Sequence, residues 1–357
     1  MLVPQDLKDR SVCIMGLGYV GLTLAVAMAE IGFHVTGVEI RDDVVELLKS
    51  GKAHFFEPTL DEKLKRAVDN SALRIFNKIP ADNASTVYII TVGTPLGEDG
   101  RARLDMIEHV SQEVAAKLKE GDLVILRSTV KIGSTNKIIV PILNEAKVHY
   151  DLAFCPERTL EGNALEEING LPQIVGGVDM ASNIRSAQLF QFLTPTVVRV
   201  RDLETAEMIK LVDNTQRDVH FAFSNEVAHM CDTIGISAAE VIKAGKLGYP
   251  RTNLAMPGPV GGPCLEKDPH ILAEAMRDLG VEPRIAMAAR EINERQPRDC
   301  VNFIARTVSG NNVPIKKVCL MGLAFKGRPA TNDLRGTMAQ PIMDALKDAF
   351  PSAGAGH

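Results

Sequence analysis

The sequence predicts an α/β fold that opens with an N-terminal Rossmann-like, doubly wound sheet and continues into a central all-helical domain. Two observations carry this prediction. Over about the first 200 residues, short apolar runs alternate with segments of helical apolar spacing, which indicates a parallel sheet covered by helices on both faces. After about residue 202 the pattern changes to long stretches of helical periodicity.

The first part begins with a β-α-β unit. Val12–Met15 is a short apolar run, a glycine turn follows it, Leu22–Ile31 has helical spacing, and His34–Val38 is the next strand. Similar units follow, with strands predicted at Val87–Thr91 and Leu123–Leu126 and a helix over Met106–Leu118. We therefore expect residues 1–201 to form a dinucleotide-binding domain.

Residues 202–310 are predicted to form the central helical domain. Glu204–Thr233 contains neither Pro nor Gly and reads as one helix. A run longer than about 25 residues suggests a spine within a dimer or between domains, although a long helix of a helical domain is the alternative. Further helices are expected at Ala238–Ala244, Pro269–Leu279 and Arg284–Val308.

Residues 311–357 start a third segment. A strand is predicted at Lys316–Met321 and a helix at Met338–Phe350, and no element is predicted from Pro351 onward. One strand and one helix cannot bury a sheet face by themselves. We therefore expect the beginning of a C-terminal domain whose remainder is missing.

Composition excludes several classes of protein. The net charge of -5 offers no basic surface for nucleic acid or an anionic membrane. No apolar run reaches the roughly 18 residues of a spanning helix, and polar Met1–Arg10 lacks the apolar core of a signal peptide. The six cysteines show no CxxC spacing, so we predict no metal site and a reduced, cytoplasmic protein. All of them except Cys264 are expected to be small core residues.

A glycine-rich turn predicts the dinucleotide site. In the GxGxxG sequence of residues 16–21, Gly16 permits the tight turn, Gly18 lets a pyrophosphate approach the backbone, and Gly21 allows close helix-strand packing. The helix start at Tyr19 and Val20 supplies amide donors and the positive end of the helix dipole.

The ends of the following strands complete this prediction. Glu39 ends the second strand, where its carboxylate can bind the ribose hydroxyls and repel a 2′-phosphate, so NAD is favoured. Arg41 leaves NADP as an alternative. Thr94 and Thr129 follow two further strands, and hydroxyl groups there suit ribose and nicotinamide contacts, although hydroxyls also cap helices.

Three polar segments suggest chemistry beyond cofactor binding. Glu157 and Glu161 lie four residues apart after a short strand, and Lys210 and Asn214 lie one turn apart on the long helix. Cys264 lies in a glycine loop with Lys267 nearby, where positive charge favours a thiolate. Each residue alone would more often be structural, and the combination with a hydride-accepting cofactor suggests oxidation past an aldehyde to an acid.

The motifs together resemble the UDP-glucose/GDP-mannose dehydrogenases, the nucleotide-sugar 6-dehydrogenases. The matching stretches occur in family order over nearly the whole chain: Gly16–Gly21, Ser128–Val130, Pro156–Arg158, Glu207–Asn214, Gly261–Asp268 and Gly322–Lys326. Other details are similar to the branch that acts on UDP-N-acetylhexosamines, above all on UDP-N-acetylmannosamine: Thr205–Met208, Asn214–Val219 and Tyr249–Asn253.

The resemblance implies a covalent mechanism. Cys264 would attack the C6 aldehyde left by a first oxidation, and the resulting thiohemiacetal would be oxidised to a thioester that water hydrolyses. Lys210 and Asn214 would hold the developing oxyanion. The remaining catalytic residues implied are Asp268, Glu161 and Thr129, which would organise water, and Glu157, which would position substrate or transfer a proton.

The resemblance also implies binding residues. Lys267 joins the cofactor residues given above, and the third segment would begin a second Rossmann-like domain that grips the uridine diphosphate. The implied substrate contacts are Arg158, Arg217, Arg251, Lys326 and Arg335, with Arg251 donated across a homodimer.

Three alternatives stay open. UDP-glucose 6-dehydrogenase would use the same chemistry with a different sugar pocket. A two-electron hydroxyacid dehydrogenase would not need Cys264. A non-catalytic NAD-binding or dimerisation protein would bind the cofactor without turning over a sugar nucleotide.

Overall fold

The computed structural model describes residues 2–310, 317–351 and 354–356. The chain divides into two compact units, residues 1–210 and residues 211–357, which are called the first and second unit below. The predicted division into three parts, with boundaries at residues 202 and 311, stays a prediction.

The first unit is built on an eight-stranded sheet with the strand order β3-β2-β1-β4-β5-β6-β7-β8. The strands are β1 (Ser11–Met15), β2 (His34–Val38), β3 (Leu73–Phe76), β4 (Val87–Ile90), β5 (Asp122–Leu126), β6 (Tyr150–Phe154), β7 (Gln173–Gly177) and β8 (Val197–Val200). The order reverses between β1 and β4, which is the switch point where ligands of open α/β sheets bind. The predicted doubly wound sheet is confirmed.

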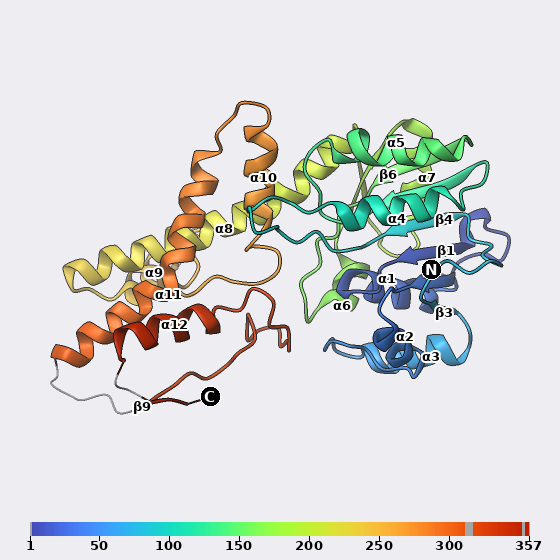
Figure 1. The fold of residues 1–357 in the computed structure, drawn as a ribbon. Helices are drawn as coiled ribbons and strands as arrows, with labels where there is room; N and C mark the ends of the chain where they lie inside the picture. The colour runs from blue at the N-terminus through green and yellow to red at the C-terminus, as the bar shows by residue number, and fades with distance from the viewer. Residues whose placement is uncertain (1, 311–316, 352–353, 357) are drawn as a thin grey trace. The chain divides into compact units, whose positions relative to one another are not determined.

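Helices cover both faces of this sheet. They are η1 (Lys8–Arg10), α1 (Tyr19–Glu30), α2 (Asp42–Lys49), α3 (Leu60–Asp69), α4 (Asp105–Ala115), η2 (Thr135–Ile139), α5 (Val140–Leu143), η3 (Asn144–Ala146), α6 (Ala164–Gly170) and α7 (Met180–Phe190). Figure 1 shows α1, α2 and α3 on one face and α4 and α5 on the other. Each face therefore has its own apolar cluster, and central strands such as β4 are buried at every position.

One strand departs from the predicted all-parallel sheet. β7 runs antiparallel to β6, with Ala153 opposite Gly177 and Phe154 opposite Gly176, and β8 is parallel to β7. Both glycines are required by close neighbours, because a Cβ on Gly176 would lie 2.3 Å from the Asp202 carbonyl oxygen and one on Gly177 2.4 Å from the Asn183 nitrogen. Alternation of strands and helices does not encode strand direction at a sheet edge, so the sequence prediction was wrong there.

The long helix α8 (Leu203–Ile234) confirms the helix predicted over Glu204–Thr233 to within one residue at each end. The second unit continues with α9 (Ala238–Lys246), α10 (Asp268–Arg277), α11 (Arg284–Gly310), β9 (Lys317–Cys319), α12 (Ala339–Ala349) and β10 (Gly354–Gly356). α11 packs against α10 and α12. The predicted strand at Lys316–Met321 is confirmed over Lys317–Cys319, and Lys316 lies outside the described residues.

The C-terminal stretch contains an element that its composition did not reveal. Gly354–Gly356, for which no element was predicted, pairs in parallel with Lys317–Cys319. A strand of glycine and alanine has no side-chain alternation to read, so periodicity could not find it.

The cysteines divide differently from the prediction. Cys13, Cys155 and Cys231 are buried, as expected, and burial raises the pKa of the first two thiols to about 12. Cys300 is half-buried, and Cys319 is exposed on the short strand β9, so the expectation of five core cysteines was wrong.

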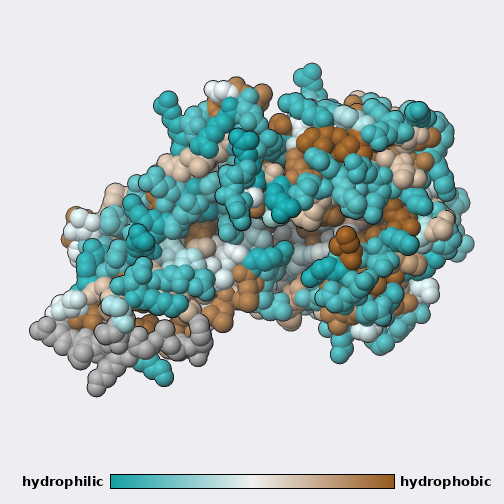
Figure 2. All heavy atoms as spheres, viewed as in Figure 1, coloured by the Kyte–Doolittle hydropathy of each residue, from teal (hydrophilic) through white to brown (hydrophobic). Residues whose placement is uncertain are grey.

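One face of the chain is mostly polar. On the face shown in Figure 2, hydrophilic residues cover most of the molecule and apolar residues show through in patches. No helix in the described part of the chain is both long and apolar enough to cross a membrane.

Candidate active site

The turn between β1 and α1 has the geometry that its three glycines predicted. Gly16 has a φ of +90°, and a Cβ there would lie 2.9 Å from a methyl of Val92. A Cβ on Gly21 would lie 1.9 Å from the Gly16 carbonyl oxygen, so helix and strand meet too closely for any other residue. At Gly18 nothing lies within 4 Å of that position, which leaves space for a pyrophosphate at the start of α1.

Thr91 fixes this turn, although the sequence did not single it out as a site residue. Its hydroxyl donates to the Gly16 carbonyl at 2.7 Å and lies 3.0 Å from that of Met15. Its position at the end of a central strand, beside the switch point, was the available signal.

Glu39 lies where a ribose-binding carboxylate is expected. It follows β2, is buried, and accepts the Leu17 amide at 3.1 Å and the Arg41 amide at 3.2 Å. The Arg41 guanidinium is more than half exposed and lies 3.8 Å from the same carboxylate. A negative charge held beside the glycine turn disfavours a 2′-phosphate, so these residues fit NAD.

The other cofactor residues predicted in the first unit lie near the carboxyl ends of its strands, whereas Lys267 belongs to the second unit. Thr94 is buried after β4, and Thr129 is half-buried after β5. Tyr19 and Val20 begin α1 and are half-buried. The carboxyl ends of β1, β4 and β5, which are neighbours in the sheet, therefore bring these residues to one edge.

A buried glutamate that the sequence gave no reason to select joins the cofactor turn to the loop after β6. Glu57 accepts the Tyr19 hydroxyl and the amides of Gly162 and Ala164, both at 2.7 Å. Burial and this carboxylate raise the pKa of Tyr19, so its hydroxyl stays protonated and donates. Glu161, buried beside Gly162, is held in place with this loop.

Both carboxylate oxygens of Glu157 accept hydrogen bonds. One oxygen accepts Nε and Nη2 of Arg127 at 3.1 and 2.5 Å, and the other accepts the amides of Arg158 and Thr159 at 2.7 and 2.8 Å. Burial alone would raise the pKa of Glu157, but the Arg127 charge and these hydrogen bonds hold it below its ordinary value. The residue predicted to position substrate or transfer a proton is thus a fixed carboxylate at the start of its loop.

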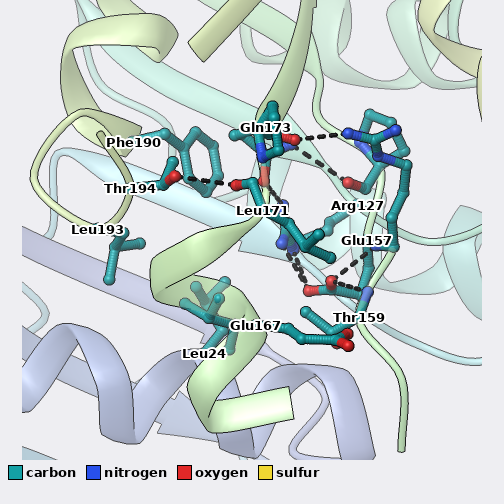
Figure 3. Close-up of a pocket in the computed structure, with 14 residues that line it drawn as sticks. Leu24, Arg127, Glu157, Thr159, Glu167, Leu171, Gln173, Phe190, Leu193 and Thr194 are labelled. Carbon is teal, nitrogen blue, oxygen red and sulfur yellow. Dashed lines mark hydrogen bonds and ion pairs between the residues drawn. The ribbon is translucent and has the colours of Figure 1, made fainter. Parts of the chain in front are cut away.

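Figure 3 shows the surroundings of this pair, with Arg127 between Glu157 and Gln173 and the side chain of Phe190 nearby. Arg127 also donates to the Gln173 side-chain oxygen at 2.8 Å and to the Cys155 carbonyl at 3.0 Å. The adjoining cavity measures about 20 Å³, which is room for about one water molecule. It is therefore too small for a cofactor or a sugar.

Lys210 is anchored to the same loop. Its ammonium donates to the Glu157 main-chain carbonyl at 2.5 Å, and the side chain is buried. One turn earlier on α8, Glu207 accepts the amides of Gly133 and Thr135, so this carboxylate of the family-like motif holds a loop. Burial raises the pKa of Glu207 despite those bonds.

In the second unit, the predicted nucleophile is accessible. Cys264 is exposed, in a turn that leads into α10, and its carbonyl accepts the Asp268 amide at 2.9 Å and the Lys267 amide at 3.3 Å. The exposed thiol therefore stands in the turn just before the N-terminus of α10.

The glycines before Cys264 are explained by the segment that lies behind them. The Gly262 amide donates to the Gly336 carbonyl at 2.8 Å. A Cβ on Gly261 would lie 2.2 Å from that same oxygen, and one on Gly262, whose φ is +102°, would lie 2.6 Å from the Phe325 ring. The two glycines thus let the C-terminal segment back the cysteine loop.

Two predicted catalytic residues of the second unit meet directly. The Asn214 amide donates to one Asp268 oxygen at 2.6 Å, and the Lys267 ammonium lies 2.9 Å from the other. Asp268 is fully buried, and both of its carboxylate oxygens are engaged, one by the Asn214 amide and the other by the Lys267 ammonium. Asn214 is buried on α8, four residues after Lys210, as predicted.

The predicted substrate residues are mostly at the surface of their units. Arg217 and Arg251 are exposed, and the Arg251 guanidinium stacks on Tyr249 at 4.7 Å from the ring centre. Arg335 pairs with Asp333, and Lys326, beside Phe325, is half-buried. Arg158 donates to the Pro172 carbonyl at 2.6 Å.

Sheet order, glycine turn and strand-end carboxylate together define a dinucleotide-binding enzyme of the Rossmann type. Comparison with protein families sharpens this class. Residues 10–194 match the NAD binding domain of the UDP-glucose/GDP-mannose dehydrogenase family, and residues 204–295 match its central domain. The chain belongs to this family and is an NAD-dependent nucleotide-sugar dehydrogenase.

Individual relatives agree with the family. A UDP-N-acetyl-D-mannosamine dehydrogenase from Methanococcus vannielii is 33% identical over 96% of this chain and 78% of its own length. The UDP-D-ManNAc dehydrogenase structure from Pyrococcus horikoshii matches with 30% identity and a TM-score of 0.87 over 97% of this chain and 82% of that one. A UDP-glucose dehydrogenase structure from Pyrobaculum islandicum matches with 28% identity and a TM-score of 0.89 over 99% and 83%.

Proposed function

We propose that this enzyme oxidises the C6 hydroxyl of a UDP-N-acetylhexosamine, with UDP-N-acetylmannosamine as the best candidate, to the uronic acid. The reaction consumes two NAD⁺ and one water and yields two NADH. Exposed Cys264, in the turn before α10, carries the proposal, because a two-electron oxidation would not need it. The relatives named for UDP-N-acetylmannosamine support the substrate. The product would serve as a precursor for a surface polysaccharide.

Cys264 acts as the nucleophile in this mechanism. Bound NAD⁺ accepts the hydride in each oxidation. After the first, the Cys264 thiolate adds to the C6 aldehyde and forms a thiohemiacetal, so the reactive aldehyde stays attached while the cofactor exchanges. The second oxidation gives a thioester, and water then adds to its carbonyl and expels the thiolate. A cytoplasmic location keeps this thiol reduced.

Lys210 and Asn214 stabilise the C6 oxygen in the proposed site. An ammonium has three donors, and the bond to the Glu157 carbonyl fixes the position of Lys210. Asn214 is fixed in turn by Asp268. Donors held in place before the reaction stabilise developing negative charge without reorganising.

The remaining roles divide between the units. Glu161, with Thr129 and Asp268, organises the hydrolytic water. Both carboxylate oxygens of Glu157 are engaged by other partners, so this residue acts by positioning Lys210 through its main-chain carbonyl. The contacts to the sugar nucleotide are proposed to come from Arg158, Arg217, Arg251, Lys326 and Arg335.

A substrate panel with two cysteine variants tests this function. NADH and uronic acid are measured for UDP-N-acetylmannosamine, UDP-N-acetylglucosamine and UDP-glucose. Wild type should form two NADH per UDP-N-acetylmannosamine, and C264S should form no acid. C319S is the matched control, because Cys319 is also exposed in the second unit, and it should behave as wild type.

Other results would select an alternative. A strong preference for UDP-glucose would move the assignment to UDP-glucose 6-dehydrogenase. Full turnover by C264S would indicate a two-electron dehydrogenase. NAD binding without affinity for any UDP-sugar would leave a non-catalytic cofactor-binding protein.

The second unit also supports a homodimer. A groove of about 1110 Å³ exposes mostly apolar surface, to which Val212 and Phe223 of α8 and Ile285 of α11 contribute, and Arg251 lines it too. Phe223 and Ile285 are 51% and 74% exposed, and exposed apolar patches of this kind mark interaction surfaces. We assign the groove to a second copy of this chain, which brings Arg251 to the partner.

Light scattering tests the dimer. F223D should shift the mass in solution from two chains to one, because it places a charge in the groove. F303D is the control, since Phe303 is 47% exposed on α11 but does not line the groove. A wild-type monomer, or an unchanged mass for F223D, would contradict this interface.

A further inference from the structure

The loop that carries Cys264 is attached at both of its ends to side chains of two helices. At its start, the Gly258 amide donates to the side-chain oxygen of Asn225 on α8 at 2.8 Å. At its end, Nη1 of Arg290 on α11 donates to the carbonyl of Leu265 at 3.1 Å. Leu265 directly follows the cysteine, so the second attachment is one residue from the thiol.

The two attachment points belong to one buried network. Asn225 donates to the Asn293 side-chain oxygen at 3.0 Å, and Asn293 donates to the Asp218 carboxylate at 2.8 Å. Arg290 donates Nε to that carboxylate at 2.9 Å. All four side chains are at most 2% exposed, so water cannot substitute for a lost partner as it would at the surface.

The network also keeps an unused donor. Nη2 of Arg290 is buried and has no hydrogen-bond partner in the part of the chain that the structure describes. A buried donor without a partner lowers the stability of the fold. If this pair only held α8 against α11, apolar side chains would therefore stabilise the contact more. The Leu265 carbonyl explains why an arginine occupies this position, because Nη1 reaches this oxygen while Nε reaches Asp218.

We infer that Arg290 is a positioning residue for Cys264, and that Asp218, Asn293 and Asn225 hold Arg290 and the far end of the loop in register. The inference rests on the proposed covalent function of Cys264. The network fixes residues 258–265 between two rigid helices, while the glycines within the loop allow the backbone to take the shape that presents the thiol. Arg290 does not touch the reacting atoms.

This arrangement predicts a specific defect when it is loosened. The first oxidation does not involve the thiol, whereas capture of the aldehyde does. A loose loop should therefore spare the first hydride transfer and slow capture, by on the order of 100-fold for a displacement of about 1 Å. Aldehyde would escape, and the NADH formed per substrate would fall from two toward one.

R290K is the main variant, because lysine keeps the positive charge beside Asp218 but lacks the planar fork that reaches Asp218 and Leu265 together. N225A is the second variant and removes no charge. R295K is the matched control, since Arg295 pairs at the surface with Asp299 on the same helix. Each is assayed for NADH per substrate and for aldehyde trapped by hydroxylamine.

A second measurement does not depend on turnover. Hydrogen exchange of residues 258–266 should accelerate at least tenfold in R290K and N225A, while exchange in the first unit and NAD affinity should match wild type. Alkylation of Cys264 by iodoacetamide, read by peptide mass mapping, should change in rate in both variants but not in R295K.

The outcomes separate this inference from the proposed function. If wild type forms no acid, the function fails, and hydrogen exchange still tests the attachment of the loop. If R290K and N225A give two NADH per substrate with wild-type exchange in residues 258–266, the inference is overturned. Loss of folding in both variants would overturn it too, in favour of a purely structural role.

Discussion

Both units bury an arginine against a carboxylate, but they use the guanidinium differently. In the first unit, Arg127 is 5% exposed, and all three of its nitrogens donate: two to Glu157, and the third to the Cys155 carbonyl and the Gln173 side chain. Every nitrogen of the planar guanidinium is therefore engaged there.

The pair in the second unit is less complete. Arg290 is 2% exposed and donates Nε to Asp218 and Nη1 to the Leu265 carbonyl, while Nη2 has no partner among the described residues. Asp218 receives one guanidinium nitrogen and one amide, whereas Glu157 receives two guanidinium nitrogens and two main-chain amides.

The carboxylate pKa values follow this difference. Burial acts against ionisation in both, but at Glu157 the Arg127 charge and the hydrogen bonds prevail and the pKa is lowered. At Asp218 burial prevails over Arg290 and Asn293, helped by the nearby charge of Glu294, and the pKa is raised. The Arg127 pair therefore holds an ionised carboxylate, whereas Arg290 divides its donors between Asp218 and the Leu265 carbonyl.

Replacement of each arginine is expected to reveal the difference between the two pairs as a difference in stability. R127M should lower the free energy of unfolding by about 3–5 kcal/mol, because it strands an ionised carboxylate among donors that hold it charged. R290M should cost about 1–3 kcal/mol, because Asp218 takes up a proton more readily. Urea unfolding at pH 7 measures both.

A surface arginine calibrates these values. Arg74 pairs with Asp82 at 3.4 Å, and both side chains are exposed, so R74M should cost no more than about 1 kcal/mol. If R290M lowers the free energy of unfolding as much as R127M does, the number of guanidinium nitrogens with a hydrogen-bond partner does not set the stability of these pairs.

Much of the fold could be predicted because its signals are local. Helical periodicity without Pro or Gly placed α8 within one residue at each end. The glycine turn was equally readable, since Gly16 and Gly21 occupy positions where a side chain has no room. The direction of β7 was not readable, because it depends on where a connection returns to the sheet and not on the residues of the strand.

The residues that hold the site together could not be predicted from the sequence, because each contacts a partner that is distant along the chain. Glu57 meets Gly162 across 105 positions, and Arg290 meets Asp218 across 72. A charged residue on a helix or loop looks like solvated surface until the chain is folded. Motifs therefore revealed the residues proposed to touch ligand, and only the structure revealed Arg127 and Arg290 behind them.

The smallest expected effect is also the one that tests the comparison most directly. Glu157 has a folded pKa below its ordinary value of 4.5, so the stability from its charge is present above that value and is lost as pH falls through the folded pKa. The stability advantage of wild type over E157Q should therefore shrink as pH falls from 7 to 3.5, as measured by thermal unfolding.

Asp218 should show the opposite slope, because its folded pKa lies above its ordinary value of 3.8. The stability from its protonated form is present below that value and is lost as pH rises through the folded pKa, so the advantage of wild type over D218N should shrink as pH rises. D82N, at an exposed pair, should show a nearly constant gap. If the gaps of E157Q and D218N move in the same direction, the two arginines hold their carboxylates alike, and the unpaired nitrogen of Arg290 has no electrostatic consequence.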